Sequence, residues 1–157
     1  MNYFIDCEFD GHNEQLLTFA CIREDDDTGL YVRVNALARD PWVLKNVVPI
    51  IGKAPVPALL VGTSQVGPTL LKYICDDQNP TIIADSPVDI ARFCHAITTT
   101  KNGTWQSVDR SYSFVAADVD IGEYFDHAHA VDGENRYPTR HNAWWDAYAL
   151  KLMLADG

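Results

Sequence analysis

The chain has little positive charge and no long hydrophobic run, and both absences limit its partners. Its 157 residues include 12 Lys and Arg against 22 Asp and Glu, for a formal net charge of −10. Polyanions usually bind to Lys and Arg, so this balance argues against a nucleic-acid partner unless divalent cations supply the positive charge. No apolar stretch approaches the ~18 residues of a membrane span, so we expect no membrane partner.

Paired cysteine motifs and a targeting signal are also missing. None of the four cysteines, Cys7, Cys21, Cys75 and Cys94, belongs to a CxxC pair. Their apolar neighbours predict reduced, buried thiols rather than disulfides or a zinc site. The first residues have neither a basic region nor a long apolar core, so we expect a cytoplasmic protein. The length and the 47% apolar content predict a single domain over residues 1–157.

Hydrophobic patterning predicts a mixture of strands and helices, with strands first. Strands are expected at 2–9, 15–23 and 30–34, joined by tight turns into an antiparallel meander, within 80–87 with its end at Asp85, and at 111–119. A short helix that Pro41 starts and Pro49 stops is expected within the stretch 42–51. Further helices are expected at 64–75 (with Ser64 as N-cap), 88–97 and 139–155. The proline-interrupted segment 53–62 is expected to be a loop or an edge segment. This order of elements predicts an α/β or α+β domain with a mixed sheet.

The first strand carries acids at every second position. Asp6, Glu8 and Asp10 lie within the sequence YFIDCEFDG and point to one face of a strand. A calcium loop of the EF-hand type is excluded, because its twelfth position would be Leu17 and no helix fits in the five preceding residues. A solvated strand face remains an alternative, although the largely apolar residues on both faces favour a central strand. Carboxylates crowded on a buried strand favour a divalent cation between them.

Two later segments offer further ligands for such a cation. Asp85 is the last residue of the apolar strand predicted in 80–87, at a position where a strand ends at a cleft, although an Asp before Ser-Pro is also typical of a helix cap or turn. His141 and Asp146 lie five residues apart near the start of the last helix, which places them about 140° apart around a helix. His141 is therefore expected in the first turn or just ahead of it, where capping or solvent exposure is the alternative role.

These motifs together resemble the DEDDh superfamily of 3′–5′ exonucleases, most closely its small bacterial and phage exoribonucleases. The resemblance is carried by YFIDCEF, TIIADSP and RHNAWWDAYAL, in that order. It implies an α/β, ribonuclease H-like fold: a mixed five-stranded sheet, its first three strands antiparallel, flanked by helices. It also implies two Mg²⁺ or Mn²⁺ ions and a histidine base. The ligands would be Asp6, Glu8, Asp85 and Asp146, and the general base would be His141. Asn142 excludes the sibling class that has tyrosine there, and Asp10, without a counterpart, would be solvated or at the cleft rim.

The resemblance makes the residue types chemically consistent with phosphodiester hydrolysis. Two metal ions about 4 Å apart stabilise both the attacking and the leaving oxygen, and histidine titrates in the range needed to accept a proton. Phe9 is the candidate for stacking on the terminal nucleotide, with a core position as the alternative. One of Trp144 and Trp145 is expected in the core and the other near the cleft. Basic side chains that could assist are Lys101, Arg110, Arg136 and Arg140, although each is more typical of a solvated position.

The polar segment 125–140 lies between the last predicted strand and the last helix. His127 and His129 lie beside acids there, but an H-x-H pair without a nearby cysteine is weak evidence for zinc. We interpret the segment as an active-site loop that delivers His141.

The expected function is hydrolysis of single-stranded 3′ ends, with RNA favoured over DNA on the resemblance alone. A 3′–5′ exodeoxyribonuclease is the alternative of the same class. A non-catalytic nucleic-acid-binding or protein-binding module and a small-molecule metallohydrolase are alternatives of other classes. The cytoplasm of a bacterium or of a phage-infected host is the expected location. A homodimer is a further expectation, since one acidic subunit offers little basic surface to a polyanion.

Overall fold

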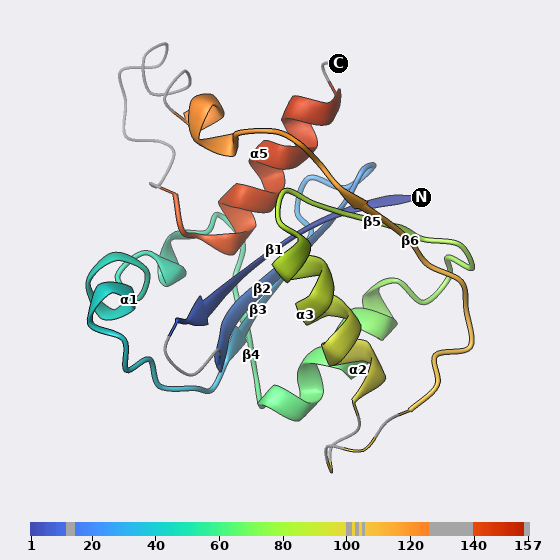
Figure 1. The fold of residues 1–157 in the computed structure, drawn as a ribbon, viewed down its shortest axis with the longest axis horizontal. Coiled ribbons are helices and arrows are strands. Elements are labelled where there is room, and N and C mark those ends of the chain that lie inside the picture. The colour runs from blue at the N-terminus through green and yellow to red at the C-terminus, as the bar shows by residue number, and fades with distance from the viewer. Residues whose placement is uncertain (12–14, 100–101, 103, 105, 126–139, 156–157) are drawn as a thin grey trace.

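One mixed sheet of six strands organises the protein (Figure 1). The computed structural model describes residues 1–11, 15–99, 102, 104, 106–125 and 140–155. The strand order is β4-β3-β2-β1-β5-β6. The strands are β1 Asn2–Asp10, β2 Gln15–Arg23, β3 Leu30–Val34, β4 Leu59–Val61, β5 Thr81–Ala84 and β6 Ser113–Ala116. The first three pair antiparallel, as the sequence predicted, whereas β3–β4, β1–β5 and β5–β6 are parallel pairs.

The helices are α1 Pro41–Asn46, α2 Val66–Tyr73, α3 Pro87–Thr98 and α5 Ala143–Ala155, with 3-10 turns η1 Ile51–Lys53 and η2 Thr63–Gln65. Residues 121–125 are also helical. Three of the helices, α1, α3 and α5, begin at residues with clear local signals. Pro87 starts α3, and the Ser86 side chain caps it by accepting a hydrogen bond from the Val88 amide. Asn142 starts α5, because its side-chain oxygen accepts from the Trp144 and Trp145 amides.

Three sequence predictions about these elements are wrong. The sheet has six strands instead of five, because residues 59–61 pair with β3 at the sheet edge. That strand is too short and too exposed to show an alternating pattern. The helix predicted from Ser64 begins at Val66, and its N-cap, Gln65, makes no side-chain capping bond. The last helix, predicted from about Thr139, begins at Ala143. By contrast, the short helix predicted between Pro41 and Pro49 is confirmed as α1.

The cysteines agree with the sequence prediction only in part. All four are free, and Cys7 and Cys21 are buried in the sheet. Cys75, just after α2, is exposed, and Cys94 is half-buried, so the prediction of four buried thiols is wrong.

Strand β1 divides the molecule into two layers. Its odd-numbered apolar residues, Tyr3, Ile5 and Cys7, belong to the core cluster that α2 and α3 cover. Phe4, on the opposite face, packs with residues of α5 instead. Figure 1 shows this arrangement, with α5 on one side of the sheet and α2 and α3 on the other. Because β1 and β5 are parallel, their carboxyl ends meet at one edge, which is where clefts form in such sheets.

Candidate metal centre

Five carboxylates meet at the carboxyl ends of β1 and β5. Asp6 and Glu8 come from β1, Asp85 directly follows β5, Asp89 lies in the first turn of α3, and Asp146 lies in the first turn of α5. They form two triads that share Asp6: one with Asp85 and Asp89, the other with Glu8 and Asp146. Within each triad, one carboxylate oxygen from each residue lies within 4.8 Å of those from the other two. Four predicted ligands from distant parts of the sequence are thus brought together.

Asp89 is the carboxylate that the sequence analysis missed. It is buried, and it accepts hydrogen bonds from the thiol and the backbone amide of Cys7, which lies between Asp6 and Glu8 on β1. The sequence feature that could have identified Asp89 is the segment DSPVD, residues 85–89. Because Ser86-Pro87 starts a helix, Asp89 falls in the first turn of that helix, beside the end of the strand that carries Asp85.

Burial and mutual repulsion raise the pKa values of these carboxyl groups. Desolvation is the largest cause for every one of them, and it raises the pKa of Glu8 to about 9 and those of Asp89 and Asp146 to about 7. The pKa of Asp6 lies well above its usual value, first through burial and then through the charge of Asp146. Carboxyl groups in such surroundings favour either a proton or a cation.

Two carboxylate oxygens at the centre of the cluster are buried without hydrogen-bond partners among the described residues. They are Asp6 Oδ2 and Asp146 Oδ1. An unpaired buried polar atom costs free energy, and such atoms are rare in folded proteins. Oxygen ligands are what Mg²⁺, Mn²⁺ and Ca²⁺ prefer. The donor set therefore fits a hard divalent cation.

Fixed positive charge also faces the cluster. The N-termini of α3 and α5 carry Asp89 and Asp146 in their first turns, so both helix dipoles favour the ionised carboxylates. Arg140 lines the cavity and lowers the pKa values of its carboxyl neighbours. Gly122 leaves room for this guanidinium, because a Cβ there would lie 2.9 Å from its Nη1.

His141 lies ahead of α5, as the sequence predicted. Its backbone has a φ of 77°, a left-handed conformation that few non-glycine residues adopt, and its amide donates to Asp146 Oδ2 at 3.0 Å. The ring lines the cavity and meets the exposed Trp42 ring edge-on, with centroids 5.0 Å apart. Burial, followed by the charge of Arg140, lowers the pKa of His141 below its usual 6.5. The imidazole is therefore neutral near pH 7 and can accept a proton.

Asp10 has a structural role, and its predicted place in solvent or at a cleft rim is wrong. The side chain is 0% exposed, and its two oxygens accept hydrogen bonds from the Arg39 and Asp40 amides at 2.9 and 2.7 Å. Asp40 in turn caps α1. A shift in the β1–β2 register between Glu8 and Phe9 separates Asp10 from the other two acids of the row. Asp10 thus ties the end of β1 to the start of α1.

The cavity holds about 210 Å³ and takes in the remaining predicted residue, Phe9. Phe9 also packs against the core, which agrees with its alternative interpretation, and its stacking on a nucleotide stays a prediction. Trp144 is buried, and Trp145 donates to the Lys53 carbonyl, away from the cavity lining, so a cleft position for Trp145 is wrong.

Arg110 donates to backbone carbonyls after α2. Lys101, Arg136 and the proposed loop with His127 and His129 lie outside the described residues.

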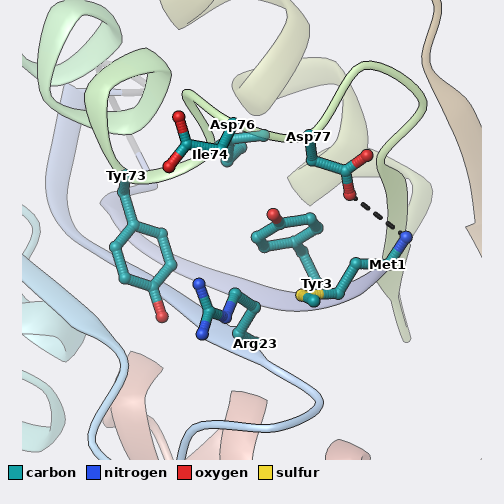
Figure 2. A pocket seen from close by; sticks show the side chains of 7 residues that line it. All are labelled: Met1, Tyr3, Arg23, Tyr73, Ile74, Asp76 and Asp77. Carbon is teal, nitrogen blue, oxygen red and sulfur yellow. Dashed lines mark ion pairs between the residues drawn. The ribbon is translucent and has the colours of Figure 1, made fainter.

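A second cavity, of about 350 Å³, lies at the opposite end of β1 (Figure 2). Several of its polar groups are paired, either with one another or with neighbouring side chains. The Met1 amine contacts Asp77 Oδ2 at 3.1 Å, and the Tyr73 hydroxyl donates to Asp26. Arg23 pairs with Asp25. These contacts hold the chain terminus against the sheet and offer few unsatisfied groups to a ligand.

The fold and this site define an α/β protein with a buried carboxylate centre suited to divalent cations. No protein-family model matches the chain, and no curated protein matches it significantly. The described helices include none with the length and apolar character needed to span a bilayer.

We predict that divalent cations stabilise the protein increasingly as the pH rises. The raised pKa values mean that the folded protein binds more protons than the unfolded chain, whose carboxyl groups titrate near pH ~4. Without metal, the free energy of unfolding should therefore fall from about pH 4 through about 7, the pKa of Asp89 and Asp146, and on to about 9, that of Glu8. Thermal unfolding in EDTA and in Mn²⁺ across this range measures both effects. A midpoint in EDTA that rises with pH would contradict the prediction.

Proposed function

We propose that this protein is a metal-dependent 3′–5′ exoribonuclease of the DEDDh type, which hydrolyses single-stranded 3′ ends with two Mg²⁺ or Mn²⁺ ions. The observation that carries the proposal is the position of Asp6 in both carboxylate triads. One carboxylate shared between two neighbouring ligand groups is what a pair of bridged cations requires. A single structural cation would need only one of the groups.

Each triad would hold one ion, with Asp6 between them. Asp85 and Asp89 would complete one site, and Glu8 and Asp146 the other. When bound, such a pair of ions activates the attacking water and stabilises the developing charge on the leaving oxygen. The pair would also bring about +4 into a cavity whose own charge is negative, which removes the objection that an acidic chain repels a polyanion.

His141 would act as the general base. Its ring lines the same cavity as the carboxylates, and its lowered pKa keeps it unprotonated at neutral pH. The amide of His141 also fixes one oxygen of Asp146, which leaves Asp146 Oδ1 for the metal. The left-handed backbone at His141 is consistent with this role, since strained conformations cluster at functional sites.

The sheet supports the resemblance to the ribonuclease H-like fold. Strands β3, β2, β1, β5 and β6 form a mixed five-stranded unit with the first three antiparallel, to which the three-residue β4 adds an edge. Phe9 lines the cavity and would stack on the terminal base, while Arg140 would contact its phosphate. The preference for RNA over DNA rests on the resemblance.

The proposal is tested with single-stranded oligomers labelled at one end, as RNA and as DNA, each with a blocked 3′ or a blocked 5′ end. We expect stepwise shortening from free 3′ ends in Mg²⁺ or Mn²⁺ and none in EDTA. A blocked 3′ end should prevent hydrolysis, whereas a blocked 5′ end should not.

Other outcomes decide against the proposal in distinct ways. Faster hydrolysis of DNA would make the protein an exodeoxyribonuclease. Turnover of short diesters without turnover of oligomers would indicate a small-molecule metallohydrolase. Binding without hydrolysis in any metal would indicate a non-catalytic module.

A further inference from the structure

A surface groove continues the metal cavity along α3. It has a volume of about 470 Å³ and is lined by Pro87, Val88, Ala91, Arg92 and His95. These residues recur at the i, i+4 spacing that places side chains on one face of a helix. Val88 lines both the groove and the metal cavity, so the two hollows meet at this residue.

Arg92 links the groove to the residue proposed to stack on the terminal base. Its guanidinium carbon lies over the Phe9 ring, 5.3 Å from the centroid. Phe9 itself lines the metal cavity. The guanidinium therefore lies against the aromatic ring, and Arg92 also lines the groove next to His95.

The composition of the groove suits a nucleic-acid backbone. The groove places the Arg92 cation and the His95 imidazole beside an exposed apolar side chain, Val88. This grouping stands out in a chain whose net charge is −10. Arginine binds phosphate through paired N–H donors, and an apolar surface accepts the face of a base. Because the groove adjoins the cavity at Val88, a strand whose 3′ end lies at the metals can extend along it.

We propose that this groove on α3 binds the nucleotides that precede the scissile one, with Arg92 and His95 contacting their phosphates and Val88 contacting a base. The inference rests on the proposed exonuclease function and adds a substrate requirement: oligomers long enough to reach the groove are preferred over dinucleotides. A dinucleotide fills the metal cavity only.

The test compares kcat/KM for 5′-labelled oligoribonucleotides of two and six nucleotides. The wild type should favour the hexamer, and Arg92→Gln should remove about tenfold of that preference, the effect of one charged hydrogen bond. Arg92→Lys, which keeps the charge, should retain part of the preference. Lys72→Gln on α2 removes the same charge elsewhere and should leave the preference unchanged. The salt dependence of hexamer binding should fall by about one unit of slope in Arg92→Gln.

Three outcomes would contradict the proposal that the groove binds these nucleotides. They are an unchanged hexamer preference in Arg92→Gln, an equal loss on both substrates, and the same change in Lys72→Gln. If the wild type hydrolyses neither substrate, the exonuclease function fails separately. In that case, fluorescence anisotropy measures binding of the labelled hexamer to the groove. The measurement is made in Ca²⁺, which binds carboxylate oxygens with flexible geometry. Binding weakened about tenfold by Arg92→Gln supports the groove, and equal binding excludes it.

Discussion

Asp6→Asn is expected to reduce hydrolysis by roughly 10³-fold or more, because the shared side chain serves both proposed ions. The amide keeps the size of the side chain and removes its charge. Both triads contain Asp6, so binding of both ions should weaken in the same variant. Oligomer hydrolysis and calorimetric titration with Mn²⁺ measure the two effects.

The same substitution should stabilise the metal-free protein. Asp6 is buried among carboxyl groups that raise one another's pKa values, and its Oδ2 has no hydrogen-bond partner among the described residues. An amide there removes one like charge and can donate to a neighbouring carboxylate. We expect a higher unfolding temperature in EDTA for Asp6→Asn and a shallower loss of stability between about pH 4 and about 9.

Asp10→Asn is the matched control, since it makes the same chemical change on the same strand. Asp10 accepts two backbone hydrogen bonds and belongs to neither triad. Its amide can accept only one of them well, so this variant should lose about 1–3 kcal/mol of stability while keeping its metal affinity. Reversed results, with Asp10→Asn losing metal and Asp6→Asn keeping it, would refute the assignment of the two residues.

His141→Asn is expected to reduce kcat by about 10²- to 10⁴-fold, the usual contribution of a general base. Asparagine is the appropriate replacement because it tolerates the left-handed backbone found at this position, where φ is 77°. The backbone amide at position 141 still donates to Asp146, so the carboxylate geometry and Mn²⁺ affinity should be retained.

The pH dependence separates a base from a structural residue. In the wild type, kcat should rise with pH through an apparent pKa below 6.5, because burial lowers the pKa of His141. In His141→Asn that rise should be absent. A variant that keeps the rise, or whose loss of activity follows a loss of Mn²⁺ affinity, would assign His141 a role other than proton acceptance.

Local pattern was sufficient for part of the site. The alternation of Asp6 and Glu8 in an apolar strand predicted a shared face, because side chains alternate strictly along any strand. The five-residue spacing between His141 and Asp146 predicted that the histidine lies in the first turn of the last helix or just ahead of it, because helical geometry fixes their angular separation, and the structure has it ahead of the helix. Asp85 was found from the end of its apolar strand.

The residues that were missed depend on contacts between distant segments. In the sequence, Asp89 is indistinguishable from the acids that are common in the first turn of a helix. Only the packing of α3 beside β1 brings it close to Asp6 and Cys7. Asp10 looked equivalent to the other acids of its strand. Its partners are the backbone amides of Arg39 and Asp40, about 30 residues away. Nearly every residue has a backbone amide, so the residue types do not indicate which amides bind Asp10.

The sequence by itself determined which strand carries the acids, which face they share, and that a histidine lies at or just ahead of the start of the last helix. These features depend on the periods of strands and helices, which are local. Only the tertiary structure decided how the acids are grouped. The parallel pairing of β1 with β5 and the placement of α3 and α5 on opposite faces bring the two triads together around Asp6. That grouping depends on packing across the sheet, which no local pattern specifies.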